Sequence, residues 1–223
     1  MSSSSAGCFS LTRKSVKSPI EMPSRADEPI DQTFDTLYNV VRSERFLGRF
    51  VLGNELPFFI SAFHPFLQNR VDILVPSLAT RLSNHGVSVL ILDLYDLTVE
   101  LLKARGIWDR LLEKESEIPK DRFLSTLTNS TAPADQLVPL IASKLEASSC
   151  SVLLITGVGL VYPFLRSHSV LENLQSVTKQ TPTVLFFPGD YSYVDGKGSY
   201  LKLFGSLPDD RYYRAFNIAD FRP

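Results

Sequence analysis

Five side chains able to bind a ligand or assist a reaction follow two short apolar runs of the sequence, at 152–155 and 184–187. Both runs stop close to Gly or Pro, a pattern typical of strands buried on both faces of a parallel sheet. Because ligands and partners tend to bind at the carboxyl edge of such sheets, we expect function there. The five side chains are Thr156, Tyr162, Arg166, His168 and Asp190.

Arg166 is the polar residue that this pattern favours most. It follows an aromatic pair, Tyr162 and Phe164, and precedes a predicted helix. A guanidinium in that position can bind a carboxylate or phosphate held at the helix N-terminus. The alternative is an internal ion pair with Asp93 or Asp190. The candidate interaction residues are Tyr162, Phe164, Arg166, His168, Asp190 and Tyr191.

The order of apolar runs and helical patterns invites comparison with the core of a P-loop NTPase. Phosphate binding there needs a Gly-rich turn, a Lys for the outer phosphates and a Ser or Thr for magnesium. The first strand-to-helix loop, at 63–70, has no Gly and no Lys, and its Pro removes an amide donor. Asp93 ends an apolar run as a magnesium-binding acid would, but capping of the next helix is the favoured role. A possible pocket at this edge contains His64, Asp93 and Thr156.

The remaining motifs predict no catalytic or metal site. The stretch 195–199 is similar to part of a phosphate loop, but its glycine spacing favours a hairpin turn. The sequence has no Gly-x-Ser-x-Gly elbow and no His-Glu-x-x-His motif, and its three histidines lack metal-ligand spacing. We therefore expect no catalytic residue, no metal and no cofactor.

The hydrophobic periodicity switches repeatedly between strand-like and helix-like along the chain. This alternation predicts a three-layer α/β fold, with a mainly parallel sheet flanked by helices, resembling a degenerate P-loop NTPase-like core. Asn69 is the expected N-cap of the second helix, and Ser169 to Glu172 fit a capping box. The predicted strands lie at 57–62, 87–92, 152–155, 183–187 and 213–218, and the predicted helices at 34–41, 71–82, 97–104, 108–115, 137–147 and 169–177, with a further short helix within 114–135.

Domain organisation follows from composition. Residues 25–223 suffice for a single α/β domain, and 44% of the chain is hydrophobic. Residues 1–24 are Ser-rich without an apolar core, so we expect a flexible leader rather than a secretory signal. Met22 is an alternative start. No apolar run is long enough to span a membrane.

Charge and cysteine content narrow the function classes. With a net charge of -1 the protein has no broad positive electrostatic field to attract nucleic acid, so direct binding of nucleic acid is not expected. Arg42, Arg45 and Arg49 could nevertheless line one helical face. Cys8 and Cys150 are too far apart in the sequence to indicate a disulfide or zinc framework, which favours a reducing cytoplasm.

Several ordered motifs carry a resemblance to a known family. They lie at 89–97, 154–168, 187–191, 201–204 and 212–216. On these motifs the chain, from about Phe34 to Ile218, resembles the BrxB family of the bacterial BREX phage-defence systems. The resemblance implies a small cytoplasmic accessory protein without enzymatic activity, acting as an adaptor for a larger BREX component, with PglZ as the expected partner.

A second function remains open at this point. The same edge could belong to a small-molecule or nucleotide sensor, or to a cryptic hydrolase. Its pocket would lie between Phe63, Thr156, Arg166 and Asp190.

Overall fold

The computed structural model describes residues 30–48, 58–174, 177–178, 181–194, 198–208 and 215–222. The predicted leader lies outside these ranges. Within them, no helix is both long and apolar enough to cross a membrane.

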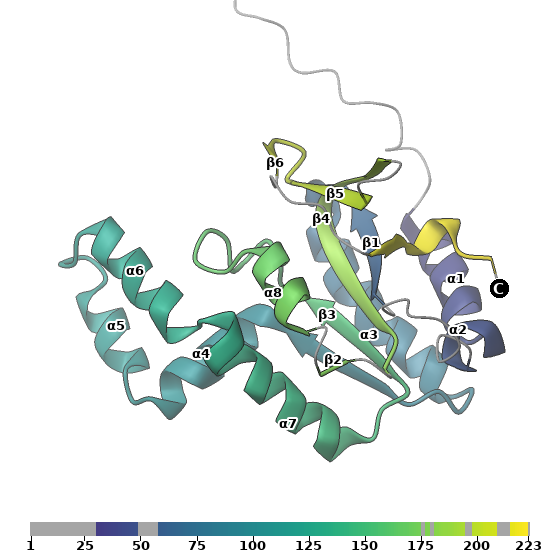
Figure 1. Ribbon diagram of the computed structural model, residues 1–223, viewed down its shortest axis with the longest axis horizontal. Coiled ribbons are helices and arrows are strands. Elements are labelled where there is room, and N and C mark those ends of the chain that lie inside the picture. Colours follow the sequence, from purple (N-terminus) through teal and green to yellow (C-terminus); the bar gives the residue numbers. More distant parts are fainter. Residues whose placement is uncertain are drawn as a thin grey trace, which may run out of the picture.

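A parallel sheet of five strands forms the centre of the molecule (Figure 1). The strand order is β2-β3-β4-β1-β7, and each neighbouring pair is parallel. All five residues of β3 are buried, as the uninterrupted apolar run predicts. The strands are β1 (Phe58–Phe63), β2 (Val89–Asp93), β3 (Val152–Thr156), β4 (Thr183–Val194) and β7 (Phe216–Asn217).

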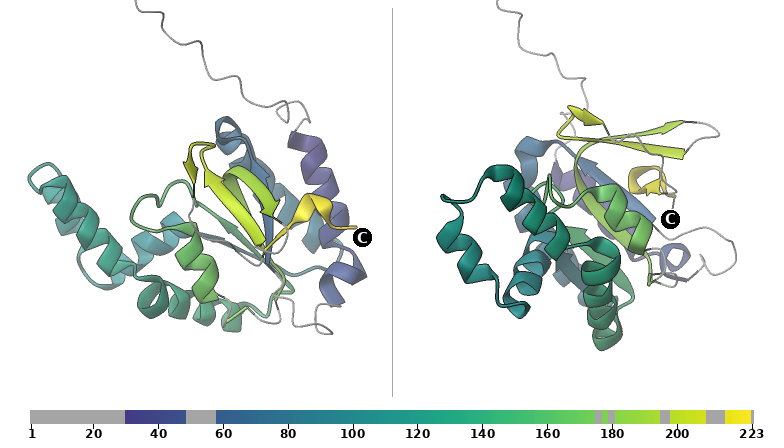
Figure 2. Two further views of the ribbon diagram at one scale, coloured as in Figure 1. Left: turned by 45° about the horizontal axis from the view of Figure 1, so that its top comes forward. Right: turned by 60° about the vertical axis from the view of Figure 1, so that its left-hand side comes forward.

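Helices cover both faces of this sheet. One face carries α1 (Ile30–Val41), α2 (Glu44–Gly48) and α3 (Gln68–Ser83). The other carries α4 (Leu94–Ala104), α7 (Val138–Ser148) and α8 (Ser167–Leu174). The helical arm, α5 (Trp108–Lys114) and α6 (Lys120–Ser130), projects from the body of the protein (Figures 1 and 2). Short helical turns lie at η2 (Pro65–Leu67), η3 (Pro133–Leu137) and η4 (Ile218–Asp220).

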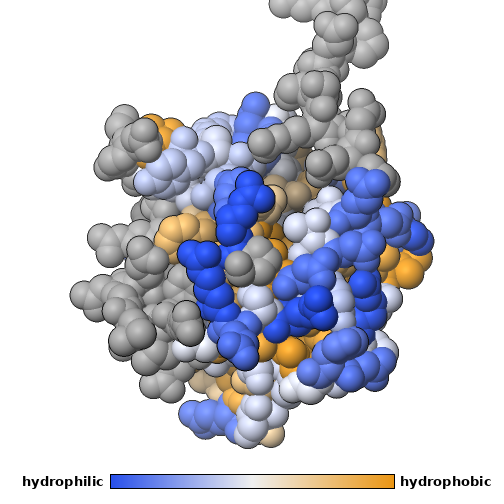
Figure 3. Space-filling view, turned by 90° about the vertical axis from the view of Figure 1, so that its right-hand side faces the viewer, coloured by the Kyte–Doolittle hydropathy of each residue, from blue (hydrophilic) through white to orange (hydrophobic). Residues whose placement is uncertain are grey.

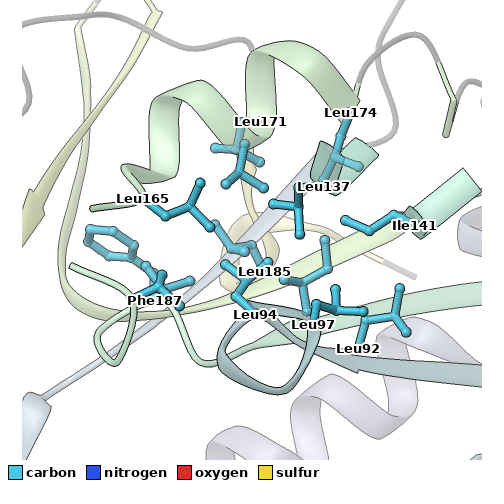
Figure 4. Close-up of a cluster of buried hydrophobic side chains, with 14 of the residues drawn as sticks. Leu92, Leu94, Leu97, Leu137, Ile141, Leu165, Leu171, Leu174, Leu185 and Phe187 are labelled. Carbon is cyan, nitrogen blue, oxygen red and sulfur yellow. The ribbon is translucent and has the colours of Figure 1, made fainter. Parts of the chain in front are cut away.

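Two apolar cores lie on opposite faces of the sheet. Successive strand residues point to opposite faces, so Leu185 packs under α8 whereas Phe186 packs under α1. The Phe186 ring stacks on that of Phe34 with 5.7 Å between centroids. Figure 4 shows Leu171 and Leu174 of α8 above Leu185 in the other core. The predicted α/β class with a mainly parallel, helix-flanked sheet is therefore confirmed, while the likeness to a P-loop core remains a prediction.

The strand predicted at 183–187 was expected to end at Pro188-Gly189, and that boundary was wrong. β4 continues to Val194 and there pairs antiparallel with β5 (Gly198–Leu203), which in turn pairs with β6 (Leu207–Pro208). Pro188 has no N–H, but its carbonyl oxygen accepts from the Phe204 N–H at 2.9 Å. The predicted hairpin around 195–199 is confirmed by its flanking strands, although its tip at 195–197 is outside the described ranges.

Three other boundaries differ from prediction. Asn69 is not an N-cap, because α3 already begins at Gln68, directly after the turn η2. The capping box was also wrong, since α8 begins at Ser167 and Ser169 lies within it. α4 begins earlier than residue 97 because Asp93 caps it.

Two predicted strands also need correction. The strand predicted at 87–92 is β2, which begins at Val89; it lies at the edge of the parallel part of the sheet, and of its five residues only Leu92 is buried. The final strand was predicted at 213–218. It comprises Phe216–Asn217, while residues 213 and 214 lie outside the described ranges.

Candidate interaction surface at the carboxyl edge of the sheet

Asp93 ends β2 and uses its whole carboxylate to hold local structure. Its Oδ1 accepts from the backbone N–H groups of Tyr95 and Asp96, at 2.8 and 3.2 Å. Its Oδ2 accepts from the Thr156 hydroxyl at 2.8 Å, across the β2–β3 register. The favoured role as a helix cap is confirmed.

Gly157 turns the chain away from β3 directly beside this carboxylate. Its φ is +77°, and a Cβ atom built on it would lie 2.6 Å from Asp93 Oδ1. Only glycine fits here without displacing the cap. The turn therefore fixes the start of the loop that carries Tyr162, Phe164 and Arg166.

His64 lies elsewhere on the same edge. It caps the turn η2, where its Nδ1 accepts from the Phe66 N–H at 3.3 Å. β4 and β3 separate its strand from β2, which corresponds to roughly 14 Å across the sheet. The fold thus brings Asp93 and Thr156 together and leaves His64 on a distant strand. Among the residues described, no group of three or more His, Cys, Asp and Glu side chains could hold a metal ion.

Arg166 lies at the surface and stacks on an aromatic side chain. Its Cζ atom is 5.8 Å from the centroid of the Tyr162 ring. Tyr162 in turn meets the Phe204 ring edge-on, with 6.3 Å between centroids. Within the described part of the chain, Arg166 forms no ion pair with Asp93 or Asp190. Its positive charge therefore has no carboxylate partner there.

The other four candidates differ in their exposure. Phe164 is half-buried and packs against the core beneath α8. His168 is half-buried within α8, and Asp190 is exposed on β4. The Tyr191 hydroxyl contacts Ser199 Oγ at 2.7 Å and donates to the Ala215 carbonyl oxygen at 3.0 Å. These bonds hold the β4–β5 hairpin to the segment before β7.

Exposed apolar side chains also follow the ends of three parallel strands, and sequence reasoning missed these three residues. Phe66 follows β1, Tyr95 follows β2 and Leu160 follows β3. Phe66 is 91% exposed, Tyr95 is 41% exposed and Leu160 is 56% exposed. Phe204, which follows β5 and lies beside Pro188 of β4, is 38% exposed. The signal available in the sequence was an apolar residue soon after each strand end.

The side of the protein that carries α1 and α2 has a different character. Hydrophilic residues predominate in the coloured part of Figure 3, with smaller apolar areas between them. Two ion pairs between exposed side chains link α1 to α3: Arg70 with Asp31 at 2.5 Å and Arg81 with Asp35 at 2.8 Å. Such exposed pairs contribute little to stability and need no partner protein.

Fold and edge together define an α/β protein with an apolar, aromatic and cationic surface where its parallel strands end. Comparison with known sequences then gives the family. The family model described as "BREX protein BrxB" matches residues 90–218. The BREX protein BrxB of Bacillus cereus (strain H3081.97) is 30% identical over 195 residues, which cover 86% of this chain and 98% of that protein. The BREX protein BrxB of Escherichia coli O9:H4 (strain HS) is 25% identical over 195 residues, covering 86% and 92%.

The chain belongs to the BrxB family, which confirms the resemblance found in its sequence motifs. It is accordingly a component of a BREX phage-defence system. No solved structure matches it.

Proposed function

We propose that the protein is a non-enzymatic adaptor of the BREX system that docks a larger component, PglZ, through the carboxyl edge of its sheet. Family membership supports action together with other BREX proteins. In this proposal the adaptor acts in the cytoplasm and needs no direct contact with nucleic acid.

The contact of exposed apolar and aromatic side chains with one another beside the end of β3 is the observation that carries this proposal. Apolar side chains that are scattered singly over a surface need no explanation, whereas a group of them marks an interaction site. Leu160 and Phe204 lie close to Tyr162, which carries Arg166 on its ring. Aromatic and Arg side chains are the residue types that dominate binding energy at protein interfaces.

The chemistry of the same edge supports an adaptor over an enzyme. Asp93 is the acid that a P-loop comparison would assign to magnesium, and three donors already occupy its oxygens. The turn after β1 begins with Pro65 at its first helical position, where a phosphate loop would offer amide donors. Both features support a scaffold that resembles a P-loop core but does not bind phosphate.

Co-purification from cells that express the whole BREX system tests the proposal. We expect tagged wild-type protein to retain PglZ, and Arg166→Ala or Tyr162→Ala to reduce the retained amount at least about tenfold. Arg81→Ala is the matched control, because Arg81 is an exposed cation in the last turn of α3 that stacks on Tyr38 and pairs with Asp35 of α1. Retention by Arg81→Ala should equal that of the wild type.

Two results would contradict the adaptor function. The first is that wild-type protein retains no BREX protein at all. The second is saturable binding of ATP, GTP or a divalent metal ion in calorimetry, which would favour the sensor or hydrolase alternative. Loss of that binding in Thr156→Val would then place the ligand at the edge.

A further inference from the structure

β2 forms one edge of the parallel sheet, and no strand of the described ranges pairs with its outer side (Figure 1). The strand at the opposite edge, β7, has only two residues, whereas β2 has five. Its residues Val89, Leu90 and Ile91 are half-buried, while every residue of β3 is buried. Because helices cover both faces of the sheet, this exposure lies along the side of the strand.

The hydrogen bonds to β3 determine which backbone groups of β2 point outward. The Ser88 carbonyl oxygen accepts from the Val152 N–H at 3.2 Å, and Val89 lies opposite Val152 in the register. Alternate residues of a parallel strand bond to one neighbour, so the N–H and C=O groups of Leu90 also point to β3. Those of Val89 and Ile91 therefore point away from the sheet. Such groups bind either water or another strand.

The sequence of β2 lacks the features that keep an open edge from pairing. Proteins protect such edges with charged side chains, with Pro or with very short strands. Residues 89–92 are Val-Leu-Ile-Leu, without a charge or a Pro. Asp93 does not supply the charge, because its carboxylate is bound to the start of α4 and to Thr156. An apolar edge of this length favours a second strand over water.

A second copy of β2 is complementary to this edge, as a contact between identical surfaces requires. In antiparallel pairing about an axis at Leu90, Val89 of one copy lies opposite Ile91 of the other. Each such pair exchanges hydrogen bonds through its outward N–H and C=O groups. Leu90 lies opposite its own equivalent, so every facing pair from 89 to 91 is apolar. The two Asp93 residues are then roughly 20 Å apart along the strands, and like charges do not meet.

We propose that the protein forms a dimer through β2, in which the parallel sheets of two copies join into one continuous sheet. The inference goes beyond the proposed adaptor function and does not depend on PglZ. Antiparallel pairing turns the carboxyl edges of the two sheets in opposite directions. The dimer thus presents the surface around Tyr162 and Arg166 twice, on opposite sides, and can hold two partner molecules.

Sedimentation velocity of the purified protein over a range of concentrations tests the dimer. We expect the wild type to dimerise reversibly and Val89→Pro to raise the dissociation constant of the dimer at least about tenfold, because Pro removes an outward N–H and its ring blocks the partner strand. The first residue of an edge strand tolerates Pro, and no bond to β3 is lost there. Val89→Thr is the matched control, since it keeps the N–H and the branched shape, and it should dimerise as the wild type does.

Hydrogen exchange of the wild-type protein, followed by NMR, tests the same contact without a substitution. We expect the Val89 and Ile91 amides to become protected as the protein concentration rises. The Leu90 amide, which bonds to β3, should be protected at every concentration. This measurement decides the matter if Val89→Pro does not fold.

Three results would overturn the dimer. One is a monomer at all concentrations, and another is a dimer that Val89→Pro leaves intact, because the contact then lies elsewhere. The third is a monomeric wild type whose Val89→Pro variant loses a co-purified BREX protein, since the edge then pairs with a strand of that protein. Failure of the adaptor function is distinguished by Arg166→Ala, which should lose PglZ and still dimerise.

Discussion

At the scale of single residues, the acid that most resembles a metal ligand is a structural group. The Asp93 carboxylate binds two backbone N–H groups at the start of α4 and the hydroxyl of Thr156. Thr156 is only 8% exposed, so loss of its acceptor would leave a hydroxyl unsatisfied in the interior. One side chain thus ties together β2, β3 and α4.

The closeness of Gly157 to this carboxylate can be measured by mutation. Gly106 and Gly157 both have positive φ, but a Cβ atom at Gly106 would meet nothing within 4 Å. Gly106→Ala should therefore cost only the backbone penalty, about 1 kcal/mol. Gly157→Ala should cost about 2–4 kcal/mol, because the new methyl group displaces Asp93 as well. Urea denaturation gives both free energies of unfolding.

A double-mutant cycle provides the control. Asp93→Ala alone should cost about 2 kcal/mol through the lost cap and the unsatisfied Thr156 hydroxyl. In that background Gly157→Ala should be less costly than in the wild type, since the clashing carboxylate is gone. Strict additivity of the two changes would show that Gly157 does not act through Asp93.

At the scale of elements, β4 is the strand that positions the candidate surface. Its first half pairs parallel with β1 and β3, and its second half pairs antiparallel with β5. Gly189 lies at the junction, where its backbone passes close to the Lys202 carbonyl oxygen. The hairpin brings Phe204 to the end of the sheet, beside the loop that follows β3.

Gly189→Ala should disrupt this junction. A Cβ atom there would overlap the Lys202 carbonyl oxygen and come within 2.9 Å of the Phe187 ring, so we expect a loss of about 2–3 kcal/mol. Hydrogen exchange should accelerate in β5. Gly205→Ala is the comparison, since its nearest neighbour, Asp190 Oδ2, is 3.6 Å away and only the backbone penalty of about 1 kcal/mol applies. Equal costs at the two positions would contradict the close approach.

At the scale of the whole molecule, stability is distributed unevenly. β3 has every residue buried between the two cores. In the helical arm, by contrast, Ser130 is the only buried residue of α6. Few buried apolar contacts mean that a segment can open without unfolding the rest.

Hydrogen exchange followed by mass spectrometry should reveal this difference. Amides of β3 and of the parallel half of β4 should exchange only through global unfolding. Those of α6 should exchange at least about tenfold faster, through local opening that costs over 1 kcal/mol less. Destabilising the core with Phe186→Ala, at a cost of about 3–5 kcal/mol, should accelerate exchange in β3 and leave α6 almost unaffected. Equal protection of α6 and β3 would mean that the arm belongs to the central cooperative unit.

Much of this architecture could be predicted from local patterns. The apolar runs at 152–155 and 184–187 correctly gave buried parallel strands, because side chains buried on both faces leave no polar position in the run. The helix at 34–41 followed from the spacing of its buried face. The capping role of Asp93 followed from its place between a strand and a helix. Family membership was also recognisable from short motifs alone.

Tertiary structure decided what depends on contacts between distant segments. The strand order put His64 far from Asp93, and no local pattern encodes which strands become neighbours. Pro188 and Gly189 look like a strand end, yet pairing with β5 carries the strand through them. Phe66 and Leu160 have the composition of core residues, and only the packed fold leaves them at the surface. Hydrophobic periodicity predicts which helices and strands form, because it depends only on residues close in the sequence. Which side chains stay exposed depends instead on how distant segments pack against one another.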